Sequence, residues 1–202
     1  MGRMISGVRL AVLAGGLLMT GLGRPVLAQD SGAPVQGRAD GQISREYSKL
    51  LVSVPGLVSA EEFYQHHILG AGGYVSYYAA VWSRNGIYPR MQVSYDTAGT
   101  GRSYTSHPAM DETWVRRLMP FFNGRVISVR GTGEAAVHHA HTISFTVDRS
   151  DCVAFHYFVG DDGASALTKA PSIVYGFYCS APGARLDASD IEEALRGISL
   201  RS

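Results

Sequence analysis

The sequence is poor in the features that mark several common classes of protein. It has two cysteines in 202 residues, no C-x-x-C pair, no internal repeat and no heptad pattern. Charged residues make up only 17% of the chain, and the formal net charge is +1. These absences exclude a closely spaced thiol redox motif, a repeat array and a coiled coil. The near-neutral charge argues against nucleic acid as the partner.

No apolar run of the sequence is long enough to span a bilayer comfortably. The longest covers residues 10–22, about 13 residues, and contains several glycines. It follows two arginines and precedes a small-residue sequence that ends at Ala28. We therefore predict a secretory signal peptide over residues 1–28 that is cleaved on export to the periplasm, with no transmembrane segment afterwards. An uncleaved anchor is the alternative.

The rest of the chain divides into a short arm and one domain. Residues 29–42 are small, polar and interrupted by glycine and proline, which predicts a flexible N-terminal arm. Residues 43–202 are long enough to bury a substantial core, and we expect a single α+β domain there.

The central part of this domain is predicted from alternating side chains. Residues 138–148 place His139, His141, Ile143, Phe145 and Val147 on one face of a strand. A two-residue turn at Arg149-Ser150 would then begin a second strand. A third strand follows over residues 172–179.

One disulfide is expected to join the second and third of these strands. Both cysteines, Cys152 and Cys179, lie in the predicted mature chain, and two cysteines in an oxidising compartment most often form a structural bridge. Pairing them places His156 opposite Tyr175 and continues the same apolar face across both strands. The agreement between the pairing and the alternation supports this register.

Four helices and one further hairpin complete the expected fold. Helices are predicted over residues 43–51, 60–69 and 110–123 and from Asp187 onward, from capping residues and apolar spacing. Asn85-Gly86 predicts a hairpin turn, although a helix over residues 74–82 is the competing interpretation. The predicted fold class is therefore α+β, an antiparallel sheet of about five or six strands with amphipathic helices packed on it. The helices from Met110 and Asp187 are expected on one face.

Histidines form the best candidate for a chemical site. His139 and His141 share a strand face, and His156 lies on the neighbouring strand, so three imidazoles would point to one side. This arrangement resembles the metal site of α-carbonic anhydrases. The resemblance covers these three residues only, in a much shorter chain, so it implies a zinc or copper site and not the activity of that family.

The opposite face of the same strands is more apolar than a solvated face requires. It carries Val153, Phe155, Tyr157 and Tyr178, and the whole chain has 11 tyrosines. Either the N-terminal helices cover this face, or a partner protein binds it.

No catalytic motif is strong, so the leading hypothesis is a non-catalytic protein without a cofactor. We expect an exported accessory subunit that binds and stabilises a larger envelope protein or complex, for instance a membrane-bound periplasmic dehydrogenase. The alternatives are a metal-binding or metal-dependent protein that uses His139, His141 and His156, and a carrier of a small ligand or lipid. In the carrier, the glycine-, serine- and threonine-rich segment 96–108 would close over the ligand.

Overall fold

A computed structural model gives the fold of most of the expected domain. It describes residues 41–57, 60–69, 74–83, 89–99, 102–118, 122, 124–160, 165–166 and 170–201. The predicted signal peptide and nearly all of the predicted arm lie outside the described residues. Every described residue belongs to one compact unit, Pro34–Ser202.

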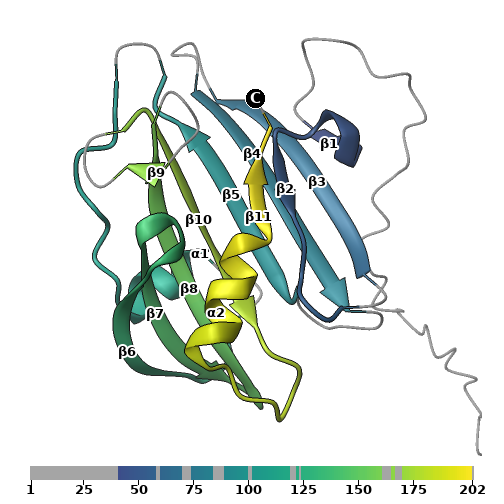
Figure 1. Cartoon of the computed structure of the whole chain (residues 1–202), viewed down its shortest axis with the longest axis vertical. Coiled ribbons are helices and arrows are strands. Elements are labelled where there is room, and N and C mark those ends of the chain that lie inside the picture. Colours follow the sequence, from purple (N-terminus) through teal and green to yellow (C-terminus); the bar gives the residue numbers. More distant parts are fainter. Residues whose placement is uncertain are drawn as a thin grey trace, which may run out of the picture. The chain divides into compact units, whose positions relative to one another are not determined.

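One antiparallel sheet of nine strands organises the described residues (Figure 1). Its strand order is β1, β3, β4, β5, β10, β8, β7 and β6, and β9 pairs with β8. The strands are β1 Gly41–Ile43, β3 Ala60–Leu69, β4 Tyr74–Ser83, β5 Met91–Thr97, β6 Ile127–Ala135, β7 Ala140–Val147, β8 Ser150–Val159, β9 Ser165–Ala166 and β10 Ser172–Cys179. A second, two-stranded sheet pairs β2 Leu50–Val52 with β11 Ile198–Leu200.

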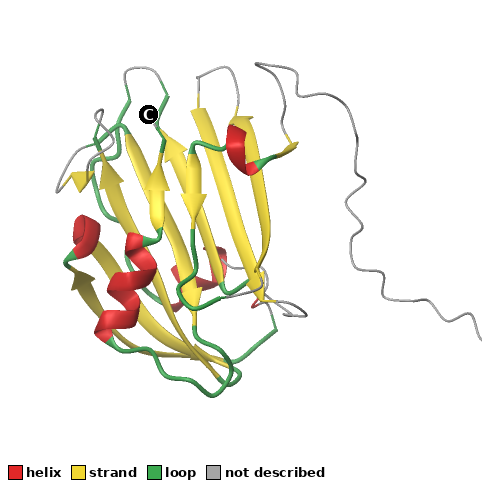
Figure 2. Cartoon of the chain, turned by 45° about the vertical axis from the view of Figure 1, so that its right-hand side comes forward, coloured by secondary structure: helices red, strands yellow, loops and turns green. Residues whose placement is uncertain are grey.

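Helices make up a small part of the described residues, as Figure 2 shows. They are α1 Glu112–Leu118 and α2 Ala188–Arg196, with 3₁₀ turns at Arg45–Tyr47 and Val137–His139. Asp187 caps α2 through reciprocal hydrogen bonds with Asp190. No helix in this part of the chain is long and apolar enough to cross a membrane.

The prediction of an α+β domain with five or six strands is wrong, because the protein is mostly β. Residues 60–69, predicted as a helix, form β3 and pair along their whole length with β4. Residues 43–51 likewise contribute to β1, a 3₁₀ turn and β2 instead of a helix. A helix of about ten residues is marginal alone, so a long neighbouring strand rich in tyrosine, valine and tryptophan overrides its capping signal.

The two central strand pairings show how much of the sheet the alternation predicts. The pairing of β8 with β10 is confirmed residue by residue, from Cys152 opposite Cys179 to Phe158 opposite Ile173. The disulfide between Cys152 and Cys179 is also confirmed. The predicted two-residue turn at Asn85-Gly86, which lies outside the described residues, would place Ala80 opposite Met91. The β4–β5 pairing is antiparallel, as that prediction requires, but Ala80 lies opposite Gln92, so the register differs by one residue.

The two faces of the sheet have separate cores. The first face carries the larger core, which includes Phe155 of β8 and Val174 of β10 and is covered by α2, β2 and β11. The second face packs Phe145 and Phe177 against the α1 residues Trp114 and Val115. In Figure 1, α2 and β11 cross the near side of the sheet and α1 lies behind it. The two helices therefore cover opposite faces, and the prediction that they share one face is wrong.

Candidate functional site

The four side chains predicted to bind a partner are buried inside the chain. Val153, Phe155, Tyr157 and Tyr178 expose at most 6% of their surface. They pack in one cluster with residues of β2, α2 and β11, including Leu50, Leu195 and Ile198. Other parts of the same chain therefore cover this face of the sheet. Part of that cover is the N-terminal strand β2, where helices were expected. No partner surface remains on these four residues.

Three histidines meet on the second face of the sheet. They are His107, which precedes α1, His141 at the start of β7 and His156 in the middle of β8. One nitrogen of each imidazole can be chosen so that all three lie within 4.8 Å of one another. Among the residues that the structure describes, this is the only group of three or more metal-binding side chains with such spacing.

The turn between β7 and β8 sets the position of His141. Its two residues are Asp148 and Arg149, not Arg149 and Ser150, because Val147 pairs with Ser150. Asp148 has a φ of 52°, which aspartate tolerates better than most residues. The observed register differs from the predicted one by two residues, so each side chain stays on its predicted face of the sheet. His141 lies directly opposite His156. Their rings are 5.2 Å apart and nearly parallel.

His107 comes from the segment that follows β5 and completes the group. Its ring centroid lies 4.0 Å from that of His141 and 5.0 Å from that of His156. Nδ1 of His107 and Nε2 of His156 are 2.9 Å apart and share one hydrogen bond. A single proton therefore joins two of the three imidazoles.

The segment that carries His107 is fixed on the sheet by contacts on both sides. The backbone of Tyr104 exchanges two hydrogen bonds with Ala170, of 2.8 and 3.1 Å. The rings of Tyr104 and His107 both stack on Phe158, with centroids 6.5 and 4.2 Å away. These contacts hold His107 over the sheet and preorganise the three-histidine cluster.

His156 is the buried member of the cluster. It has no exposed surface, and its Nδ1 lacks a hydrogen-bond partner among the described residues. Burial is the main cause that lowers the pKa of His156 from 6.5 to about 3, and the nearby His107 and His141 lower it as well. The imidazole is therefore neutral at physiological pH, which is the form that binds metal ions.

His139 lies outside this cluster, although the sequence predicted it as a ligand. The regular strand begins at Ala140, and His139 belongs to the preceding 3₁₀ turn with a φ of 51°. Its side chain is half exposed, and Nδ1 lies 3.6 Å from Oε1 of Glu134. Its neighbour His138 stacks on Tyr157, on the other face of the sheet. The predicted H-x-H geometry, and with it the resemblance to α-carbonic anhydrases, is thus absent from the cluster.

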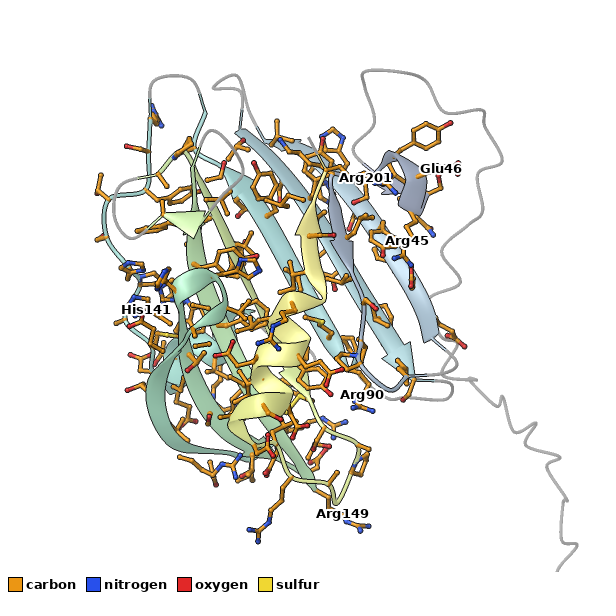
Figure 3. All side chains as sticks on the ribbon, viewed as in Figure 1. Arg45, Glu46, Arg90, His141, Arg149 and Arg201 are labelled. Carbon is orange, nitrogen blue, oxygen red and sulfur yellow. A yellow bond between two sulfur atoms is a disulfide. The ribbon has the colours of Figure 1, made fainter. Side chains whose placement is uncertain are left out.

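A pocket opens beside His141. It has a volume of about 520 Å³ and is lined by His141, Pro108, Met110, Thr132, Glu134 and Thr142. Glu134 on β6 lies directly across from His141 on β7, whose side chain Figure 3 labels. The cluster is therefore closed on the His156 side and accessible on the His141 side.

The cluster fits the requirements of a zinc or copper ion. Zinc binds imidazole nitrogens at about 2.0–2.1 Å, so neighbouring nitrogens in a tetrahedral site are about 3.3 Å apart. The candidate nitrogens lie within 4.8 Å of one another, so a bound ion would have to draw the widest pair closer to reach this spacing. Three histidines leave one coordination position open, as in catalytic and exchangeable sites.

The lowered pKa of His156 predicts a loss of stability in mild acid. In the unfolded chain the imidazole of His156 is protonated below about pH 6.5, whereas in the folded chain it is protonated only below about pH 3. The contribution of this group to stability is therefore complete only above pH 6.5. In EDTA, we expect this histidine to lower the free energy of unfolding by about 1.4 kcal/mol between pH 7.5 and 5.5. Urea titrations at both pH values measure it.

The control for this effect is His156→Leu. His138, whose pKa burial also lowers, keeps its contribution in that variant. The pH dependence should therefore shrink without vanishing. An equal dependence in both proteins would contradict the assignment to His156.

Comparisons with protein-family models, with curated proteins and with solved structures give no match for this chain.

Proposed function

We propose that this protein binds one divalent transition-metal ion, zinc or copper, through His107, His141 and His156. The observation that carries the proposal is the convergence of three imidazoles, with candidate ligand atoms within 4.8 Å, beside an accessible pocket. Imidazole nitrogen is a preferred ligand of both ions. The neutral state of buried His156 supports the proposal further, because an ion would not have to displace the second proton of an imidazolium.

The open coordination position decides what the bound metal could do. His141 faces a pocket of about 520 Å³, which gives water or a small molecule a path to the ion. Glu134 lines the same pocket and lies across from His141, so its carboxylate would be near an ion that the three histidines held. A bound ion would supply Lewis-acid chemistry, and Glu134 would be available to accept or donate a proton, so we favour an exchangeable or reactive metal site over a purely structural one.

The proposed site is compatible with export. The disulfide between Cys152 and Cys179 supports an oxidising compartment, as the predicted signal peptide does. The proposed accessory subunit has weaker support, since the four side chains on which it rested are buried. Metal binding is therefore our leading function.

Metal retention tests this proposal directly. The protein is stripped with EDTA, loaded with zinc or copper, dialysed, and then assayed for metal by mass spectrometry and calorimetry. We expect one ion per chain and an increase in thermal stability, because the ion binds only the folded arrangement. Less than a tenth of an equivalent retained after dialysis, with no thermal shift for either metal, would reject the site.

A further inference from the structure

A second pocket lies on the same face of the sheet, next to the histidine cluster. It has a volume of about 370 Å³ and is lined by Asp96, Tyr104, Ser106, Trp114, Ile173 and Tyr175. Pro108 lines both this pocket and the one beside His141. The volume is at the small end of ligand-binding cavities, which suits a compact group.

A carboxylate is held in this pocket by two neutral hydroxyl groups. Ser76 donates a hydrogen bond of 2.6 Å to Oδ1 of Asp96, and Tyr175 donates one of 2.7 Å to Oδ2. Within the described part of the chain, no lysine, arginine or histidine forms an ion pair with Asp96. The carboxylate is thus oriented by its partners, while its negative charge has no counterion there.

Three aromatic side chains from different elements line the same pocket. Tyr104 comes from the segment before α1, Trp114 from α1 and Tyr175 from β10. Tyr104 is fixed by Phe158 and by its backbone pairing with Ala170. Trp114 is fixed by the helix, whose first turn is capped by Asp111 through a 2.8 Å bond to the Trp114 amide. The aromatic walls are therefore preorganised.

We propose that this pocket binds an organic ammonium ion, with a quaternary, methylated head group as the best fit. Aromatic faces attract cations, and methylated ammonium ions are commonly recognised in aromatic cages. Both oxygens of Asp96 already accept a hydrogen bond, and a quaternary ion needs none because it carries no N–H group. The charge of Asp96 and the aromatic side chains of Tyr104, Trp114 and Tyr175 that line the pocket supply what such an ion requires.

The first test needs no variant and compares two probes of the same shape. Choline carries the quaternary charge, and 3,3-dimethyl-1-butanol is its neutral carbon analogue. In the wild-type protein with EDTA present, NMR titration should give choline an affinity at least about tenfold above the alcohol, since the difference reports cation–π and charge attraction. Equal affinities for the two probes would overturn the proposal. So would the absence of choline binding at ~10 mM, which is the weak limit of specific binding.

Two variants then assign the binding to this pocket. Asp96→Asn should weaken choline binding about tenfold and leave the alcohol unchanged, because only the charge is removed. Glu193→Gln makes the same charge change on the exposed side of α2, on the opposite face, and should leave choline binding unaltered. Equal losses in both variants would show a general charge effect and overturn the assignment. EDTA keeps the outcome separate from that of the metal site.

Discussion

Replacing His107 with alanine is expected to weaken zinc binding about a thousandfold, whereas replacing His139 should change it less than about threefold. His107 supplies one of three nitrogens that converge in the structure, and a site with two remaining imidazoles holds zinc far less tightly. His139 lies in a turn beside Glu134 and contributes no atom to the cluster. Calorimetric titration of EDTA-stripped protein with zinc measures both affinities.

The pair of variants separates two geometries of the site. The alternation of side chains in the sequence favours His139, while the structure brings in His107. His139→Ala is a matched control, because it removes the same side chain from a half-exposed position. A large loss for His139→Ala with little loss for His107→Ala would contradict the cluster described above. Circular dichroism of each variant checks that the sheet is intact.

Replacing Gly176 with alanine is expected to destabilise the protein by about 4 kcal/mol or more, above the usual range for overpacking. A Cβ atom at this position would lie 2.1 Å from the carbonyl oxygen of Gln92 and 2.9 Å from Cα of Val93. Both atoms belong to the backbone of β5, so no side chain can rotate away. Urea unfolding of the purified variant, or its failure to accumulate as folded protein, measures the effect.

Gly131→Ala is the control for this substitution. Gly131 lies on β6, and a Cβ atom there would meet nothing within 4 Å. Its replacement should change the free energy of unfolding by less than about 1 kcal/mol. Similar losses for both variants would show that the effect comes from glycine removal in general, and not from the close approach of β10 to β5.

The parts of the sheet that the sequence predicts are those fixed by two local signals at once. In β8 and β10, the alternation of side chains and the disulfide between Cys152 and Cys179 demand the same register, and the structure has it. Residues 60–69 had only a capping pattern and apolar spacing. Their strand depends on β4, and the sequence pattern of a single segment does not reveal such a partner.

The candidate site also contains residues that the sequence predicts and one that it does not. His141 and His156 were predicted from alternation on neighbouring strands, and a register error of two residues left their faces unchanged. His139 was assigned to the same strand, which in fact begins one residue later at Ala140. His107 lies in a segment without periodicity, so no pattern singled it out. Its place depends on contacts with Phe158 and on the pairing of Tyr104 with Ala170.

The burial of the predicted partner surface has a similar origin. Phe155 and Tyr157 were correctly placed on a face of their own, and the sequence left open whether the chain or a partner covers it. The cover includes a pairing between β2 and β11, which come from opposite ends of the domain. Sequence patterns within either short strand do not predict such a distant pairing.

The position of β10 between β5 and β8 has a consequence for how the chain reaches this structure. Strands β3 to β5 and strands β6 to β8 each pair with their neighbours in sequence, so each set can form through local contacts. Among the strands that the structure describes, β10 alone joins the two sets, and its pairing with β5 closes a long stretch of chain. Closing such a loop costs entropy before any contact is gained, so the docking of β10 is expected to limit the folding rate. His107 and His156 both lie within that stretch, and His107 is held by the pairing of Tyr104 with Ala170, just before β10. The histidine cluster would then become complete only at this last step.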